Sequence, residues 1–125
     1  MKYSDQNGVG DIKNAYMMVN TSISGAGGVY LYYNRPTGRL YLRDDANTSW
    51  GTGSLLGASG STLTNSRCSI DCVNSLASPT GNDLNLTLKV IYKPGFTGLK
   101  NIYMYVDDSV GANSGWVARG TVTIN

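Results

Sequence analysis

The segment DLNLTLKVIY, residues 83–92, alternates polar and apolar side chains from its first position. Successive side chains of a β-strand point to opposite sides of the sheet, so one face of this segment is apolar and the other is polar. The apolar face holds Leu84, Leu86, Leu88 and Val90, and the polar face holds Asn85, Thr87 and Lys89. The pattern predicts a strand that covers a hydrophobic core with one face.

The same period of two recurs along the rest of the chain. It is clear in GVYLYYN (28–34), RLYLRDD (39–45), NIYMYVDD (101–108) and WVARGTVTIN (116–125), and less regular in residues 12–20 and 62–70. Turn sequences rich in proline, glycine and asparagine separate these segments, among them NRPTG at 34–38 and KPGFTG at 93–98. Residues 48–61 are rich in glycine and serine and indicate a long loop or an irregular edge strand. About seven strands without a helical period predict one all-β domain over residues 1–125, built as a two-sheet sandwich.

The composition argues against several classes of function. The chain has no histidine, and its eight acidic residues are all aspartates, so an imidazole base and a glutamate acid are both absent. The only adjacent acids are Asp44–Asp45 and Asp107–Asp108, and neighbours on a strand point to opposite faces. The net charge is only +2, and the basic residues are scattered rather than clustered as in a nucleic-acid interface. No apolar run reaches the ~20 residues that cross a bilayer. We therefore expect neither an enzyme, nor a nucleic-acid-binding protein, nor a membrane protein.

Several motifs together resemble immunoglobulin-like repeats of large secreted proteins from soil bacteria. They are YSDQNGVGDI (3–12), VYLYYN (29–34), LYLRDD (40–45), NSRC (65–68), LNLTLKV (84–90), KNIYMYVDD (100–108) and NSGWVARGTVTI (113–124). The resemblance covers nearly the whole chain. It implies an immunoglobulin-like sandwich in an extracellular or cell-surface setting, as part of a secreted protein or derived from one. It implies no particular activity.

The start of the chain departs from those repeats. Similar repeats carry a strand rich in threonine and phenylalanine before the Tyr-Ser-Asp turn, whereas here only Met1, Lys2 and Tyr3 precede it. The first strand of the sandwich is therefore predicted to be missing or truncated. An unfilled strand position exposes backbone donors and acceptors, which would favour a homodimer through sheet edges or a donated strand. Alternatively, residues 48–61 or the last strand cover the gap, or the domain tolerates a shorter sheet.

Nine tyrosines and two tryptophans suggest an aromatic surface. Aromatic rings stack against the apolar C–H faces of sugars, and several tyrosines lie opposite an aliphatic stripe on their strands. The predicted sugar platform comprises Tyr30, Tyr32, Tyr41, Tyr103, Tyr105 and Trp50. The alternative is that tyrosines merely form cross-strand pairs that cover a sheet. Trp116 could end the platform, but the NSGW turn favours a ring that plugs one end of the sandwich.

The first turn also suggests a calcium site. Asp5, Asn7 and Asp11 offer the carboxylate and carbonyl oxygens that calcium prefers, and Asp107 or Asp108 would complete the set from a neighbouring loop. Aspartate, asparagine and glycine are equally typical of turns that hold no metal. Calcium is the only cofactor that the sequence suggests.

The two cysteines, Cys68 and Cys72, lie in RCSIDC. Two cysteines without histidine are too few ligands for a zinc site. The alternatives are a local disulfide across a tight turn and two free, partly buried thiols. In the similar repeats a cysteine tends to precede the Tyr-Leu-Tyr-Tyr stretch and would pair with Cys68. Gly28 and Val29 stand there in this chain, so the resemblance leaves Cys72 as the only partner.

Taken together, these patterns predict a non-catalytic extracellular module with a structural, adhesive or partner-binding role, which pairs through an exposed sheet edge. The alternative is a carbohydrate-binding module that uses the tyrosine and tryptophan platform. The expected partners are a protein, a glycan or a second copy of the chain.

Overall fold

The computed structural model describes residues 1–125 and consists of ten β-strands with one short 3-10 turn, Val9–Asp11. It contains no helix of the length and apolar character needed to cross a membrane. The strands are β1 (Lys2–Ser4), β2 (Ile12–Asn20), β3 (Val29–Asn34), β4 (Arg39–Leu42), β5 (Ser54–Leu55), β6 (Thr62–Thr64), β7 (Cys68–Thr80), β8 (Asp83–Tyr92), β9 (Gly98–Asp108) and β10 (Val117–Ile124).

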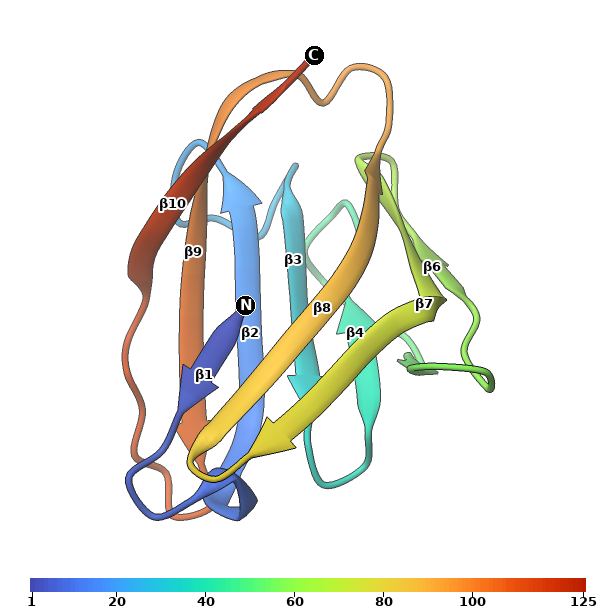
Figure 1. The fold of residues 1–125 in the computed structure, drawn as a ribbon. Helices are drawn as coiled ribbons and strands as arrows, with labels where there is room; N and C mark the ends of the chain where they lie inside the picture. Colours follow the sequence, from blue (N-terminus) through green and yellow to red (C-terminus); the bar gives the residue numbers. More distant parts are fainter.

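The strands form two antiparallel sheets that pack face to face (Figure 1). The four-stranded sheet has the order β1-β8-β7-β6, and the six-stranded sheet has the order β10-β9-β2-β3-β4-β5. Seven of the ten strands contain four residues or more, which matches the number predicted. The all-β, two-sheet sandwich is confirmed.

The core lies between the sheets and is built from the apolar positions of the alternating segments. Leu84 and Leu86 of β8 are fully covered, as the pattern at 83–92 predicts. Leu31 of β3, on the other sheet, and Ile70 of β7, on the same sheet, are covered to the same extent and belong with them to one cluster of 17 buried residues. Each such side chain contributes about 1.5–3 kcal/mol by leaving water. The opposite face of each sheet is therefore free for other tasks.

Eight of the ten strands follow the order of a variable-type immunoglobulin domain, and the short edge strands β5 and β6 have no counterpart in it. In chain order, β1 to β4 take positions B, C, C′ and C″, β7 and β8 take D and E, and β9 and β10 take F and G. No strand of residues 1–125 lies in position A, and β1 fills only three residues of position B. The immunoglobulin-like arrangement and the short first strand both agree with expectation.

The short strand β1 is held by its own backbone and by Tyr3. Its residues pair with Asp83–Asn85, and the Met1 amino group donates to the Leu86 carbonyl oxygen over 2.9 Å. Tyr3 is 3% exposed, and its hydroxyl donates to the carbonyl oxygen of Tyr16 on the other sheet over 2.9 Å. One side chain thus ties the first strand across the sandwich.

The predicted alternative of a disulfide between Cys68 and Cys72 is wrong. Both thiols are free and buried on the inner face of β7. A strand rises about 3.3 Å per residue, so four residues separate the two Cα atoms by about 13 Å. A disulfide needs them within about 7 Å, which a tight turn would have allowed and a strand does not.

Candidate functional site

Four tyrosines form a row across the outer face of the six-stranded sheet. Tyr41 of β4 lies opposite Tyr32 of β3, which lies opposite Tyr16 of β2, which in turn lies opposite Tyr105 of β9. Their ring centres are separated by 4.7 Å, 5.3 Å and 5.2 Å along this row. The neighbours of these tyrosines on each strand point into the core, so the four rings face away from it.

Three more rings join the row. Tyr30 precedes Tyr32 on the same face of β3, and Trp50 and Trp116 reach the sheet from two different loops. The ring of Trp50 lies 4.7 Å from both Tyr30 and Tyr32, and that of Trp116 lies 5.4 Å from Tyr105. All seven rings are half-buried, so each keeps an exposed part. We call this surface the aromatic face: Tyr16, Tyr30, Tyr32, Tyr41, Trp50, Tyr105 and Trp116.

The segment before Trp50 is fixed by polar contacts. The Asp44 carboxylate accepts from the backbone N–H and the hydroxyl of Thr48, both over 2.7 Å. Arg43 donates to the side chain and the backbone of Asn47 over 2.9 Å, and its guanidinium lies 4.9 Å from the ring centre of Trp50. Trp50 therefore carries a cation on its ring and has a defined position.

Trp116 lies on the aromatic face, so the prediction that it plugs one end of the sandwich is wrong. Its ring contacts those of Tyr16, Tyr30 and Tyr105 outside the core. The segment before it folds back onto β9, because the Ser114 backbone N–H donates to the Val106 carbonyl oxygen and the Val106 N–H donates to the Ser114 hydroxyl, both over 3.0 Å. This turn directs the ring over the sheet.

Four of the rings enclose a shallow hollow of about 220 Å³, lined only by Tyr16, Tyr30, Tyr105 and Trp116. The ring planes meet at angles between 36° and 87°, so the hollow presents both ring faces and ring edges. Beyond Tyr16 and Tyr105, the next pair across β2 and β9 is Asn14 and Asp107. The carboxylate of Asp107 therefore lies one outward-facing position beyond Tyr16 and Tyr105, and it is not part of the lining of the hollow.

Three tyrosine hydroxyls of this face, those of Tyr16, Tyr30 and Tyr32, stay protonated at neutral pH. Burial, assisted by the negative charge of Asp107, raises the pKa of Tyr16 to about 12. Burial also raises the pKa of Tyr30 and of Tyr32. The aromatic face thus combines neutral rings with hydroxyl groups that can donate and accept hydrogen bonds.

The structure places five of the six predicted platform residues together: Tyr30, Tyr32, Tyr41, Tyr105 and Trp50. Tyr103 lies on the same side of β9 but is only 9% exposed, and Asn101 donates to its hydroxyl over 3.1 Å. Tyr16 was missed, because the segment around it has an irregular pattern in which Met18, an apolar residue, also points outward. Its position opposite a tyrosine on either side depends on the pairing of the strands, which a single segment does not reveal.

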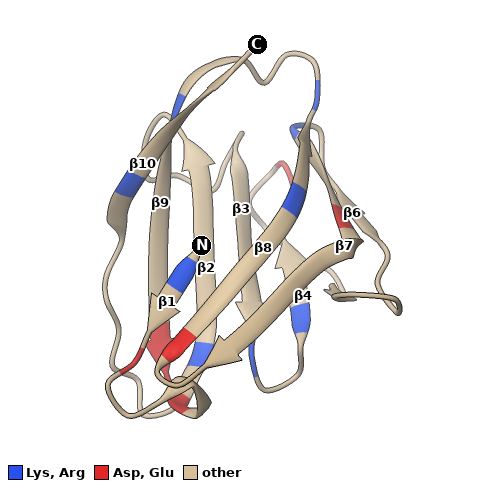
Figure 2. Ribbon diagram, viewed as in Figure 1, with Lys and Arg blue, Asp and Glu red and all other residues tan.

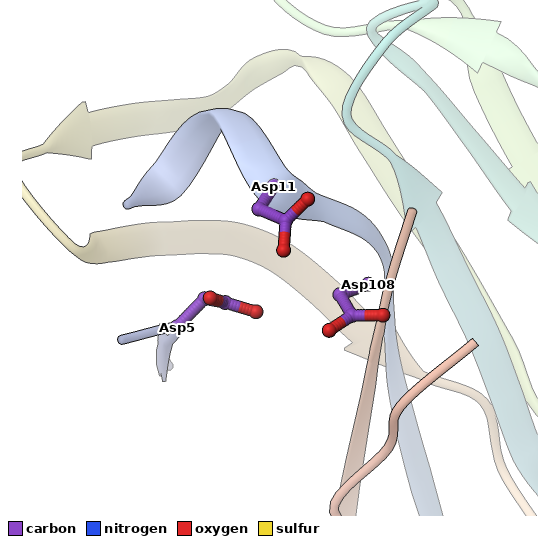
Figure 3. Close-up of side chains that lie close together, drawn as sticks. All are labelled: Asp5, Asp11 and Asp108. Atoms are coloured by element: carbon purple, nitrogen blue, oxygen red, sulfur yellow. The ribbon is translucent and has the colours of Figure 1, made fainter. Parts of the chain in front are cut away.

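A second feature lies at one end of the sandwich, where Asp5, Asp11 and Asp108 gather their carboxylates within 4.8 Å (Figure 3). Several acidic residues gather at this end, with others beside β6 and above β4, while the basic residues are spread over the molecule (Figure 2). A polar pocket of about 410 Å³ lies beside the cluster, lined in part by Asp5, Asn7 and Asp108. Three carboxylates at this spacing are a donor set of the kind that calcium accepts.

Hydrogen bonds within the protein also explain the positions of these three carboxylates. Asp5 accepts from the Asn7 backbone N–H over 2.8 Å, and Asp108 accepts from the backbone N–H groups of Val110 and Ala112 over 3.0 Å and 2.8 Å. The Asn7 side chain lies within 3.5 Å of Asp11, to which it donates. Of the two acids predicted as alternatives on β9, Asp108 joins the cluster. Asp107 points to the opposite face, where it accepts from the Asn14 backbone N–H over 2.9 Å.

Comparisons with known proteins give no assignment. No family model matches the chain, and neither a curated protein nor a solved structure is significantly similar to it.

Proposed function

We propose that this protein is a non-catalytic extracellular binding module that recognises a carbohydrate through the aromatic face. The observation that carries the proposal is the continuous set of seven half-exposed rings across β4, β3, β2 and β9. Sugars bind such surfaces because their apolar C–H patches lie flat on rings while their hydroxyls bond to polar groups at the edges. The absence of histidine and glutamate supports a binding role rather than a catalytic one.

The size of the aromatic face favours an oligosaccharide over a single sugar. The row of four tyrosines crosses three gaps between strands, which amounts to about 14 Å at the usual strand spacing. Neutral tyrosine hydroxyls along this row can bond to sugar hydroxyls without the cost of burying a charge. The ring contacts also stabilise the sheet, at about 0.5–1.5 kcal/mol for each pair. Binding and stability therefore depend on the same side chains, and a test must separate them.

Affinity electrophoresis and titration calorimetry against a panel of soluble and insoluble glycans test the proposal. We expect binding to at least one glycan, and we expect Trp116→Ala and Tyr32→Ala each to weaken it about tenfold or more, as loss of a stacking ring does. Leu76→Ala is the matched control, since Leu76 is 62% exposed on the other sheet. Melting curves show whether each variant is folded. No retention by any glycan, or retention that the ring variants leave unchanged, would contradict the proposal.

The edge of β8 supports a second candidate function, which is self-association. Beyond Leu86, no strand lies beside β8 on the side of β1, and the N-terminus lies midway along the sandwich in Figure 1. The backbone groups of Leu88, Val90 and Tyr92 point to that side, as those of Leu86 do. An apolar groove of about 370 Å³ follows the same edge, lined by Met1, Met17, Leu86, Thr87, Leu88, Val90 and Tyr92. This is the unfilled part of position B.

A second copy of the chain is the occupant that we propose for this groove. Two β8 edges related by a two-fold axis run antiparallel, so each N–H of one copy meets a carbonyl oxygen of the other. We expect light scattering to show a monomer–dimer equilibrium, which Val90→Pro removes because proline adds bulk and lacks the N–H at the edge. The control is Leu76→Ala, which leaves the open edge of β8 intact. Thr87→Pro would not serve as a control, because the backbone of Thr87 faces β7 and not the open edge. A strict monomer at high concentration would contradict this candidate and would leave the glycan proposal standing.

A further inference from the structure

The four-ring hollow on the aromatic face has the properties of a site for a cation. A positive charge is attracted to the negative face of an aromatic ring, and several rings around one ammonium group add their effects. Tyr16, Tyr30, Tyr105 and Trp116 surround the hollow with ring centres 5.2–6.4 Å apart and contribute all of its lining. No aliphatic side chain lines the hollow.

Asp107 supplies a negative charge next to the hollow, outside its lining. It is the next outward-facing residue after Tyr105 on β9, and its influence on the hydroxyl of Tyr16 shows that its charge is felt at the hollow. The two ion pairs of the protein, Lys2–Asp83 and Lys89–Asp71, lie on the other sheet. Asp107 itself has no lysine or arginine partner and accepts only from the backbone and the side chain of Asn14. A carboxylate without a counter-ion beside an aromatic hollow is complementary to a ligand cation.

The opposite end of the aromatic face differs in charge. There the Arg43 guanidinium already lies over the ring of Trp50 at 4.9 Å. A second cation at that ring would be repelled, and the charge of Arg43 also acts on the Tyr30 hydroxyl. A positively charged ligand group is therefore favoured on the Tyr16 and Tyr105 side of the hollow, which is nearest to Asp107. The face therefore carries a positive charge, that of Arg43, at the Trp50 end and a negative charge, that of Asp107, beyond the other end.

We propose that the hollow seats a protonated amino group, and that the carbohydrate bound by the aromatic face is one with free amines, such as an oligomer of glucosamine. This inference rests on the proposed function, and it names the chemical class of the ligand. The sugar rings stack along the tyrosine row while one ammonium group enters the hollow beside Asp107. An N-acetylated oligomer of the same length offers the same rings without the charge.

The test compares these two oligomers by titration calorimetry. We expect the glucosamine oligomer to bind about tenfold more tightly than its N-acetylated counterpart, and we expect the ratio of the two affinities to fall to about one in Asp107→Asn. Asp71→Asn is the matched control, because it removes the same charge from the other sheet. In the wild-type protein the preference should also vanish as the pH rises through the pKa of the ligand amine. That measurement needs no variant, so a preference that persists above the pKa of the amine overturns the inference even if Asp107→Asn does not fold.

Each outcome is decisive. Equal or weaker binding of the free amine overturns the inference but leaves the proposed function in place. A preference that Asp71→Asn removes as fully as Asp107→Asn overturns it too, because the effect is then one of overall charge. Binding of neither oligomer, nor of any other glycan, overturns the proposed function and the inference with it.

Discussion

Gly53 sets the path of the chain from Trp50 to the sheet. Its φ is 69°, and a Cβ at this position would lie 2.7 Å from the Leu40 carbonyl oxygen and 2.7 Å from the ring of Tyr41. We expect Gly53→Ala to cost about 1–2 kcal/mol for the left-handed backbone and about 1–3 kcal/mol more for the contacts. Urea unfolding measures the loss. Gly51→Ala is the control, with a φ of 65° and nothing within 4 Å of the added Cβ, and an equal loss in both variants would show that the contacts do not matter.

The acidic cluster of Asp5, Asp11 and Asp108 leads us to expect that neutralising one of its carboxylates stabilises the protein. Asp5 lies among three carboxylates that repel one another, at about 1 kcal/mol for a pair near 4 Å in water. Asp5→Asn keeps the acceptor for the Asn7 N–H, so we expect the free energy of unfolding to rise at low salt in a buffer free of divalent ions. The gain should shrink as added salt screens the charges.

Asp71→Asn provides the contrast to Asp5→Asn. Asp71 lies 3.6 Å from the Lys89 ammonium and accepts from the Asn74 side chain over 2.7 Å, so its neutralisation should lower the free energy of unfolding. Denaturant titrations at two salt concentrations compare the variants. A loss of stability in Asp5→Asn comparable to that in Asp71→Asn would show that hydrogen bonds, and not repulsion, dominate the cluster.

At the scale of the elements, the first strand depends on a hydrogen bond across the sandwich. The Tyr3 hydroxyl is buried, which raises its pKa far above the ordinary value, and it donates to the Tyr16 carbonyl oxygen. Tyr3→Phe should therefore cost about 0.5–1.5 kcal/mol and speed the hydrogen exchange of the Leu86 N–H, which donates to Met1. Tyr92→Phe is the control, since its hydroxyl makes no hydrogen bond within the protein. Unchanged exchange at Leu86 in Tyr3→Phe would contradict this role.

The elements also show what the sequence can and cannot reveal. Alternation located β8 because Leu84 and Leu86 are followed by polar residues, and the same rule placed Tyr30 and Tyr32 on one face of β3. Within one strand the rule does not tell which residues of other strands lie opposite. The position of Tyr16 between Tyr32 and Tyr105 follows from the pairing of three strands.

The direction of a side chain in a loop is harder to predict, because no alternation rule applies to it. The NSGW turn was correctly placed in a loop, but the direction of Trp116 depends on the bonds between Ser114 and Val106, which join residues eight positions apart. The two aspartates at the end of β9 illustrate the same limit. Alternation shows that Asp107 and Asp108 face opposite ways, and only the fold shows that Asp108 meets Asp5.

At the scale of the whole molecule, the composition determines how stability depends on pH. Hydrogen bonds from Thr48, Asn74 and Ser4 lower the pKa of Asp44, Asp71 and Asp83, respectively, below the ordinary value. A carboxyl whose pKa is lower in the folded state contributes stability above the unfolded pKa of about 3.9, and this contribution is lost as the pH falls through the folded value. There is no histidine to titrate at higher pH.

The melting temperature should therefore stay level from about pH 7 to about pH 5 and fall below about pH 4. Scanning calorimetry over this range checks the prediction. Asp83→Asn, which removes one of the shifted carboxyls, should show a smaller fall between neutral and acid pH than the wild-type protein. A marked fall above pH 5 would contradict the account, since the chain has neither histidine nor glutamate and the ordinary pKa of an aspartate side chain is about 3.9.

The two thiols report on the integrity of the whole sandwich. Cys68 and Cys72 are 0% exposed between the sheets, and burial raises the pKa of Cys68 to about 12. Burial also raises the pKa of Cys72. Only the thiolate reacts with iodoacetamide, so the folded protein should resist labelling at mildly alkaline pH, whereas both thiols should react in urea.

The sheets must separate before either sulfur is reached. The slow rate of labelling in the native protein should therefore follow the global unfolding rate, and both rates should fall in a stabilised variant such as Asp5→Asn. Reducing agent should leave the melting temperature unchanged, because no disulfide links the strands. Rapid labelling of the native protein would show that the sandwich opens locally along β7 instead of unfolding as one unit.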